Sequence, residues 1–258
     1  MPRPRRKVIL FIVEGESDYD ALYTPIAKLL EDIDEELLFD ILTADGDVTS
    51  DFGKDPNNMN YLLNRYYFKP FFKEKAQYFY PRDVVRVIHL IDTDGCFLPD
   101  SHMKLWKREK TVDFPYYEPP YIFHEQPENM VKRNDHKTTN IRYFKSMETI
   151  QVISKTVPYE IYYFSCNIDH CLNGVNCLNL CTREKKLLAE RFAEAHETDS
   201  KLFLDTMRLC LPPLDEPTYD STWDFITQGE NSINRYSNLY IGLKKLVEDF
   251  STDKQNEN

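Results

Sequence analysis

The sequence lacks any apolar run long enough to cross a membrane. Its first apolar run, residues 8–13, has only six residues before Glu14 ends it. A membrane-spanning helix needs about 20 apolar residues, and a signal peptide also needs a longer apolar stretch than this one. The run therefore predicts neither kind of segment. The basic residues 1–7 predict a solvated terminus, with an arm that contacts phosphate as the alternative. We expect a cytoplasmic protein with no membrane partner.

The sequence also lacks a surplus of basic residues. It carries 43 acidic and 32 basic side chains, a formal net charge of −11. This balance counts against a protein that holds nucleic acid through a broad basic surface. It does not exclude an enzyme that acts on phosphate esters, because a bound metal ion or a local basic patch can hold a phosphate group.

One stretch, residues 132–145, is locally basic. Its candidate substrate-binding residues are Lys132, Arg133, Lys137 and Arg142. One interpretation is a patch that binds the phosphates of a nucleic acid. The other is the exposed face of a helix, whose charges are simply solvated. The sequence leaves both interpretations open.

Two well-defined binding motifs are absent from the sequence. The pattern G-x-x-x-x-G-K-[ST] does not occur, so the chain has no P-loop ATPase of its own. The paired C-x-x-C knuckles of structural zinc sites are also absent. Four of the six cysteines nevertheless cluster around His170, namely Cys166, Cys171, Cys177 and Cys181. We expect reduced thiols in and near the core, and leave zinc binding by this cluster open.

Length and composition predict an α/β protein with a helical appendage. The chain has 258 residues, of which 41% are hydrophobic, enough for a sizeable core. Short apolar runs predict strands, and helical spacing of apolar residues dominates after residue 171. We expect a Rossmann-like, mostly parallel sheet flanked by helices over residues 1–170, and a helical extension packed on it over residues 171–258. The oligomeric state stays open, and a homo-oligomer is compatible with the sequence.

Local patterns predict where the first helix begins and where prolines interrupt the first and second helices. Ser17 and Asp20 fit a capping box at the start of the first helix, which needs no chemical role for them. Pro25 is expected to restart that helix, because proline suits a first helical turn better than a helix interior. Residues 58–79 predict a second helix, which Pro70 should kink or divide.

Acidic residues follow two of the apolar runs. Glu14 and Glu16 come after residues 8–13, and Asp92 and Asp94 come after residues 84–91. Ligands of open α/β sheets bind beyond the carboxyl ends of the parallel strands. Carboxylates that converge there repel one another unless a cation neutralises them, and their oxygen atoms suit Mg²⁺ or Mn²⁺. Because residues i and i+2 of an extended strand point to one face, both aspartates are predicted to reach one cation.

The two acidic segments also carry a family resemblance. Glu14-Gly15 and Asp92-x-Asp94-Gly95, in this order and each after a strand, resemble the two signature motifs of the TOPRIM domain. Residues 13–18 (VEGESD) are similar to the form found in OLD-type nucleases of bacterial phage defence. The resemblance implies a TOPRIM-like fold, Mg²⁺ or Mn²⁺ as cofactor, and Glu14, Asp92 and Asp94 as metal-binding and catalytic residues. It further implies a nuclease that cleaves DNA or RNA with a separate ATPase as partner.

Further acids are candidates for the same site. Glu16 is a candidate extra metal ligand. Residues 165–170 (SCNIDH) loosely resemble the Asn-Pro-x-Phe-Glu segment of RloB-type TOPRIM proteins, with Asp169 in place of Glu and without the Pro. Asp169 is therefore a candidate metal ligand or a neighbour of one. Asp45 and Asp47 lie in a turn after another predicted strand and are weaker candidates, because Asp-Gly is also a common turn dipeptide.

Two alternatives to a nuclease remain open. Residues 90–95 (LIDTDG) also resemble the opening motif of haloacid-dehalogenase-type phosphatases, with Asp92 as nucleophile and Asp94 as acid/base. That reading leaves Glu14 unexplained, and Cys96 stands where the phosphatases carry Thr. The second alternative is a non-catalytic TOPRIM-like module that binds a nucleic acid or a protein.

Overall fold

A five-stranded sheet forms the centre of the computed structural model, which describes residues 6–44, 48–51, 58–107, 112–113, 115–173 and 179–256. The strand order is β2-β1-β3-β8-β7. The strands are β1 (Lys7–Val13), β2 (Leu37–Thr43), β3 (Val84–Asp92), β7 (Thr149–Val152) and β8 (Lys155–Phe164). The first four in the sheet order run parallel, and β7 pairs antiparallel with β8. The predicted α/β class with a mostly parallel sheet is confirmed.

The apolar runs form strands because the sheet is covered on both faces. Every residue from Val8 to Val13 is completely buried, which is why β1 reads as a continuous apolar run rather than an alternating one. Strand β1 lies between β2 and β3, and β3 lies between β1 and β8. The carboxyl ends of these strands therefore meet at one edge of the sheet.

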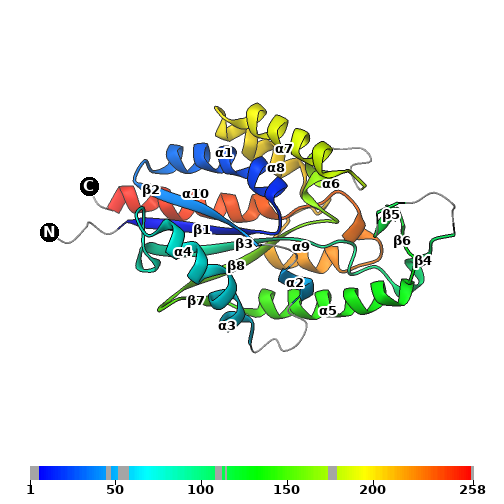
Figure 1. The fold of residues 1–258 in the computed structure, drawn as a ribbon. Coiled ribbons are helices and arrows are strands. Elements are labelled where there is room, and N and C mark those ends of the chain that lie inside the picture. The colour runs from blue at the N-terminus through cyan, green and yellow to red at the C-terminus, as the bar shows by residue number, and fades with distance from the viewer. Residues whose placement is uncertain are drawn as a thin grey trace.

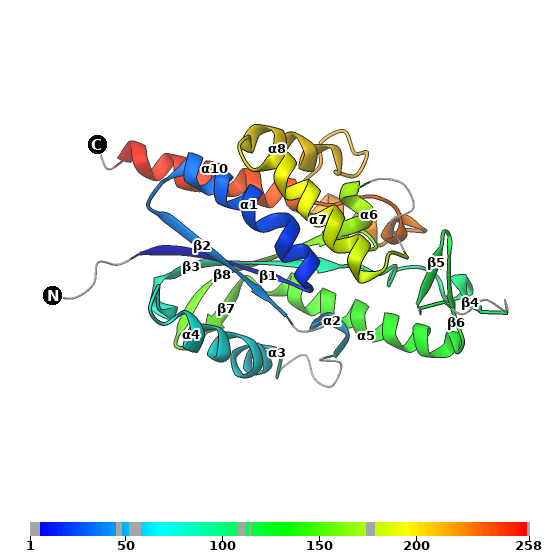
Figure 2. The ribbon, with the colours of Figure 1, turned by 45° about the horizontal axis from the view of Figure 1, so that its top comes forward.

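Helices pack on both faces of the sheet, as Figures 1 and 2 show. One layer contains α1 (Glu16–Ile33), α6 (Ile168–Asn173), α7 (Thr182–His196), α8 (Ser200–Leu209) and α10 (Leu239–Asn256). The other contains α3 (Met59–Leu63), the π-helix η2 (Asn64–Phe68), α4 (Lys69–Lys75), α5 (Pro127–Ser146) and α9 (Tyr219–Ile226). The short helix α2 (Val48–Asp51) lies beside α5. No helix within the described residues is long and apolar enough to cross a membrane.

The helices after residue 171 share their apolar layer with α1. Helix α10 approaches β8 so closely that a Cβ atom on Gly242 would lie 2.6 Å from the ring of Tyr162. Only glycine permits this approach without a shift of the ring. The carboxyl-terminal helices thus pack directly on the sheet that carries the acidic segments.

Two predictions about where the first helix begins and where it is interrupted are wrong. Helix α1 is continuous through Pro25, which is buried in the core layer, so packing outweighs the hydrogen bond that proline cannot donate. The capping pair is Gly15 and Asp18, not Ser17 and Asp20, because the helix begins one residue before Ser17.

The segment around Pro70 stays helical but changes its winding. The π-helix η2 precedes α4, and Pro70 stands in the first turn of α4. Proline lacks the N–H that an α-helix would place against the carbonyl of Tyr66, and the wider π turn accommodates that loss. This winding also decides where Tyr66 and Tyr67 point.

A small second sheet stands at the carboxyl ends of the main strands (Figure 1). It consists of β4 (Met103–Leu105), β6 (Tyr121–His124) and β5 (Tyr116–Glu118), in that order. Its inward side chains Met103, Tyr117 and Ile122 form a third apolar cluster. Strands of three residues, such as β4 and β5, are too short to show a period of alternating apolar residues in the sequence.

Candidate functional site

The predicted site residues lie at the carboxyl ends of three adjacent parallel strands. Glu14 follows β1, Asp92 is the last residue of β3, and Asp169 lies in the first turn of α6, which follows β8. Register fixes this arrangement, because Ile12 pairs with His89 and Asp92 pairs with Phe164. The site therefore forms where an open α/β sheet binds its ligands.

Asp92 is placed among other acids. Removal from water raises its pKa well above the usual range, and the carboxylates of Asp18 and Asp94 raise it further. Lys137 and Lys185 oppose the shift without cancelling it. Burial first, and then the neighbouring carboxylates, therefore make ionisation of Asp92 less favourable than that of an isolated aspartate.

Asp94 sits in a tight turn rather than in the strand. Its φ is 48°, and β3 ends two residues earlier. The premise that Asp92 and Asp94 share the face of an extended strand is thus wrong, although each still acts on the other. The turn is fixed by the Asp94 N–H, which donates to the Cys166 carbonyl at 2.8 Å, and by the Thr93 hydroxyl, which donates to the Ser232 carbonyl at 2.8 Å.

A buried ammonium group joins the first two strand ends. The side chain of Lys137, on α5, is completely buried. Its Nζ lies 2.6 Å from Oδ2 of Asp94 and 3.8 Å from Oε2 of Glu14. Glu14 and Asp94 are therefore brought to the same cation, although 80 residues separate them in the sequence. The two acidic segments thus meet at a lysine side chain, whereas the sequence argument expected them to meet at a divalent ion.

Asp18, the residue that caps helix α1, is also a member of the acidic cluster. It accepts the Gly15 N–H at 2.9 Å, and it also faces Asp92 and Asp169. Burial is the main cause that raises its pKa to about 7, and the Gly15 hydrogen bond opposes the rise. The sequence feature that could have indicated this role is the position of Asp18, four residues after Glu14 and in the first turn of the following helix.

Asp169 joins the cluster from the opposite side. Its carboxylate lies 3.8 Å from Nζ of Lys185 on α7. Burial raises the pKa of Asp169, and Lys185 lowers it in part. Asp169 also contributes to the raised pKa of Asp18. The third strand end thus belongs to the same electrostatic unit.

The cluster opens into a cleft of about 640 Å³. Asp92 and Asp94 line it together with the cations Arg133 and Lys185 and the ring of Tyr117. Arg133 donates to the Asp94 carbonyl at 2.9 Å, and the Tyr117 hydroxyl lies 3.4 Å from Oδ1 of Asp94. Acidic and basic groups therefore face the same space.

The basic stretch divides between two sides of α5. Arg133 and Lys137, one helical turn apart, face the acids. Lys132 and Arg142 are exposed, and Arg142 borders a different cavity beside Trp223. The exposed-helix interpretation therefore describes Lys132 and Arg142, whereas Arg133 and Lys137 lie within the acidic cluster.

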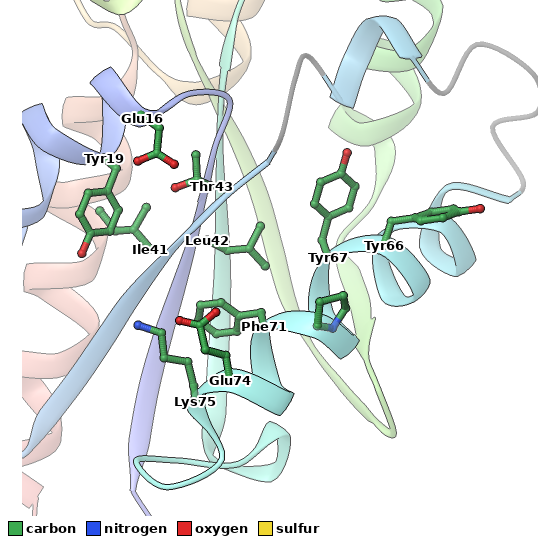
Figure 3. A pocket seen from close by; sticks show the side chains of 11 residues that line it. Glu16, Tyr19, Ile41, Leu42, Thr43, Tyr66, Tyr67, Phe71, Glu74 and Lys75 are labelled. Atoms are coloured by element: carbon green, nitrogen blue, oxygen red, sulfur yellow. The ribbon is translucent and has the colours of Figure 1, made fainter. Parts of the chain in front are cut away.

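Glu16 is not gathered with the other acids. It is exposed and lines a separate cavity beside Thr43 and Tyr19 (Figure 3). Glu16 is the first residue of helix α1 and Asp18 is the third. The side chain of Glu16 therefore points to a different side of the helix from the side chain of Asp18. Asp45 and Asp47 lie outside the described residues.

The described part of the chain was compared with the ligand groups that metal ions require. There, no three His, Cys, Asp or Glu side chains are grouped so that they could hold one ion. Cys166 and Cys171 are buried, Cys181 is exposed, and Cys177 lies outside the described residues. Burial and Arg235 lower the pKa of His170 to about 4. Nothing in this geometry supports zinc.

Comparison with protein-family models, curated proteins and solved structures finds no match for this chain. Its function is therefore inferred from its own residues.

Proposed function

We propose that the protein is a nuclease that uses Mg²⁺ or Mn²⁺ to cleave phosphodiester bonds of DNA or RNA. The observation that carries the proposal is the grouping of Glu14, Asp92 and Asp94 around the strand ends, with Lys137 between two of them. Burial and neighbouring carboxylates raise the pKa values of Asp92 and Asp18, and a divalent cation would relieve the repulsion among these groups. The resemblance to the TOPRIM motifs supports the same assignment.

The residues fit a divalent ion in donor type and in charge. Carboxylate oxygens are the ligands that Mg²⁺ prefers, and Asp92 has like-charged neighbours that keep its pKa raised. The described side chains form no three-ligand group. Mg²⁺ does not require one, because it commonly binds through one or two carboxylates together with waters and substrate phosphates. Asp92 would hold the ion, with Asp94 or Asp18 as the second ligand.

The other side chains have separate roles in this proposal. A bound divalent ion supplies an activated water and stabilises charge on the phosphoryl oxygens. Arg133 and Lys185 line the cleft and would bind non-bridging phosphate oxygens. Lys137 orients Glu14 and Asp94, and Glu14 would transfer a proton during cleavage.

Charge explains why the substrate would bind locally rather than across the surface. The whole chain carries a net charge of −11, which repels a polyanion at long range. The cations of the cleft therefore have to bind the scissile phosphate themselves. A role in phage defence, a cytoplasmic location and an ATPase partner rest on the family resemblance and belong to this proposal.

The test is a cleavage assay with matched variants. Purified protein is incubated with Mg²⁺ or Mn²⁺ and plasmid DNA, single-stranded DNA, or transfer RNA, beside Glu14→Gln, Asp92→Asn and the surface control Glu31→Gln. The proposal expects metal-dependent cleavage that both site variants lose and the control keeps. Hydrolysis of small phosphomonoesters that survives Glu14→Gln would instead identify the phosphatase alternative. No hydrolysis at all, with nucleic-acid binding kept by both site variants, would identify the binding module.

A further inference from the structure

A second cavity, of about 710 Å³, lies on the outer side of β2 (Figure 3). Helix α1 borders it on one side, and η2 with α4 borders it on the other. Aromatic and charged side chains make up much of its lining. None of the lining residues borders the cleft of the acidic cluster. The cavity is therefore a separate candidate binding site.

Aromatic rings form the walls of this cavity. Tyr66 and Tyr67 come from the π-helix η2, Phe71 comes from α4, and Tyr19 comes from α1. Tyr66 is 54% exposed. π-helical turns are rare and often mark functional sites, since they reposition side chains that an α-helix would place elsewhere. Here the π turn places two adjacent tyrosines at the cavity.

The charge of the lining favours a cation. Lys75 is paired with Asp40 at 2.9 Å, which compensates its charge. Glu16 and Glu74 then leave the lining negative. In Figure 3 their carboxylates lie on opposite sides of the cavity, with Thr43 beside Glu16. Carboxylates and ring faces both attract a positive group, and both repel a phosphate.

The protein already holds one cation in this way. Nζ of Lys75 lies 5.7 Å from the centroid of the Phe71 ring, besides its contact with Asp40. An ammonium group is thus accommodated by one ring and one carboxylate at the cavity floor. The rest of the cavity offers a second cation the ring of Tyr67 and the carboxylates of Glu16 and Glu74 on its two sides.

A partner could bind here either by adding a strand to the edge of β2 or by inserting a side chain into the cavity. The contacts at this edge favour the inserted side chain. Within the described residues β2 pairs on one side only, with β1. However, the Asp40 carboxylate accepts the N–H of Ile41 at 2.9 Å and also binds Lys75. This covers the edge at Ile41, as proteins commonly do with charged side chains.

We propose that this cavity binds the guanidinium group of an arginine from a basic segment of a partner protein. A guanidinium group is planar, stacks on aromatic rings, is weakly hydrated and pairs with carboxylates through two parallel hydrogen bonds. A lining of aromatic rings and carboxylates therefore suits arginine better than lysine. The net charge of −11 complements a basic partner and would speed its association. The proposal is independent of the nuclease activity, because the two sites share no lining residue.

The experiment measures peptide binding by amide chemical shifts of the full chain without added metal. The probe is a blocked Ser-Gly-Arg-Gly-Ser peptide, with matched peptides that carry citrulline or lysine instead of arginine. We expect saturable shifts at residues 41–43 and 65–75 with the arginine peptide, at least about tenfold weaker binding of the citrulline peptide, and intermediate binding of the lysine peptide. Citrulline keeps the shape of arginine and removes its charge, so equal binding of that peptide would overturn the proposal.

Variants tie the binding to the cavity. Glu16→Gln combined with Glu74→Gln should weaken binding of the arginine peptide about tenfold, and Tyr67→Leu should do the same. Glu31→Gln, also on α1 but outside the cavity, should leave binding unchanged; unaltered amide spectra elsewhere would show that each variant is folded. If agmatine bound as tightly as the peptide, the occupant would be a small guanidinium compound, and the proposed protein partner would be overturned. Binding of guanosine monophosphate at the same amides, or no saturable shift with any peptide, would overturn the proposal.

Discussion

The Nζ atom of Lys137 lies 2.6 Å from Oδ2 of Asp94, and no part of the lysine side chain is exposed. A buried ammonium group is stable only with a partner of opposite charge, and Asp94 and Glu14 are such partners within the described part of the chain. Through this one residue, helix α5 is fixed to the ends of β1 and β3. The contact therefore serves both the fold and the proposed chemistry.

Loss of the Lys137 charge should destabilise the protein. Lys137→Met leaves two carboxylates at the site without their nearest cation, and breaking such a buried pair costs about 3 kcal/mol. Urea unfolding measures this loss. Adding Asp94→Asn to Lys137→Met should restore part of the stability, and Lys132→Met, on the exposed side of α5, should change it little. Equal small effects of the two lysine variants would contradict the buried pairing.

The raised pKa of Asp18 should make stability depend on pH. In the folded protein this pKa is about 7, against 3.8 for an unperturbed aspartate. The folded state thus holds the proton more tightly, so the stabilisation is complete below about pH 4 and is lost as pH rises to about 7. Asp18→Asn keeps an acceptor for the Gly15 N–H and abolishes the titration.

The test of this pH dependence compares melting temperatures of the two proteins. Asp18→Asn should gain stability relative to the unaltered chain at about pH 8 and gain little at about pH 4.5. Asp20→Asn, on the same helix turn and with no such burial, serves as the control. A difference that does not change with pH would show that Asp18 titrates normally.

A divalent ion should stabilise the folded protein through Asp92. Mg²⁺ at about one hundred times its dissociation constant adds about 2.7 kcal/mol to the stability of a protein that binds it only when folded. The ion must displace the proton of Asp92, so the stabilisation should grow with pH. Differential scanning fluorimetry with and without Mg²⁺ measures it, and Asp92→Asn should abolish the Mg²⁺ effect. A Mg²⁺-induced shift that persists in this variant would place the ion elsewhere.

The contact between α10 and β8 gives a test of the fold alone. Gly242→Ala would place a methyl group 2.6 Å from the Tyr162 ring, and such overpacking costs about 1–3 kcal/mol. Chemical denaturation should show this loss, whereas Lys244→Ala, exposed on the same helix, should stay close to the original stability. Full stability of Gly242→Ala would mean that α10 packs differently.

Sequence patterns predicted the elements that rest on local periodicity. The buried runs that became β1 and β3 and the helical segments α7 and α8 follow directly from apolar spacing. The small sheet was missed because β4 and β5 have three residues each. Pro25 was misjudged because burial in a packed layer outweighs helix propensity.

The site was predictable only where residues sit at strand ends. Glu14 and Asp92 follow from the rule that parallel strands share a carboxyl edge. Asp18 was hidden, because a capping aspartate and a cluster member look identical in sequence. The role of Lys137 required knowing which face of α5 meets the sheet, and the apolar residues of that helix are too few to show it.

The rate of nucleic-acid cleavage as a function of Mg²⁺ concentration tests the central claim most directly, measured for the unaltered chain and for Asp92→Asn. The account predicts cleavage that saturates with Mg²⁺ and falls at least about 100-fold in the variant, with the fold intact by circular dichroism. Cleavage that proceeds equally without Mg²⁺ or Mn²⁺, or that survives Asp92→Asn unchanged, would contradict a metal-dependent centre at the ends of β1 and β3.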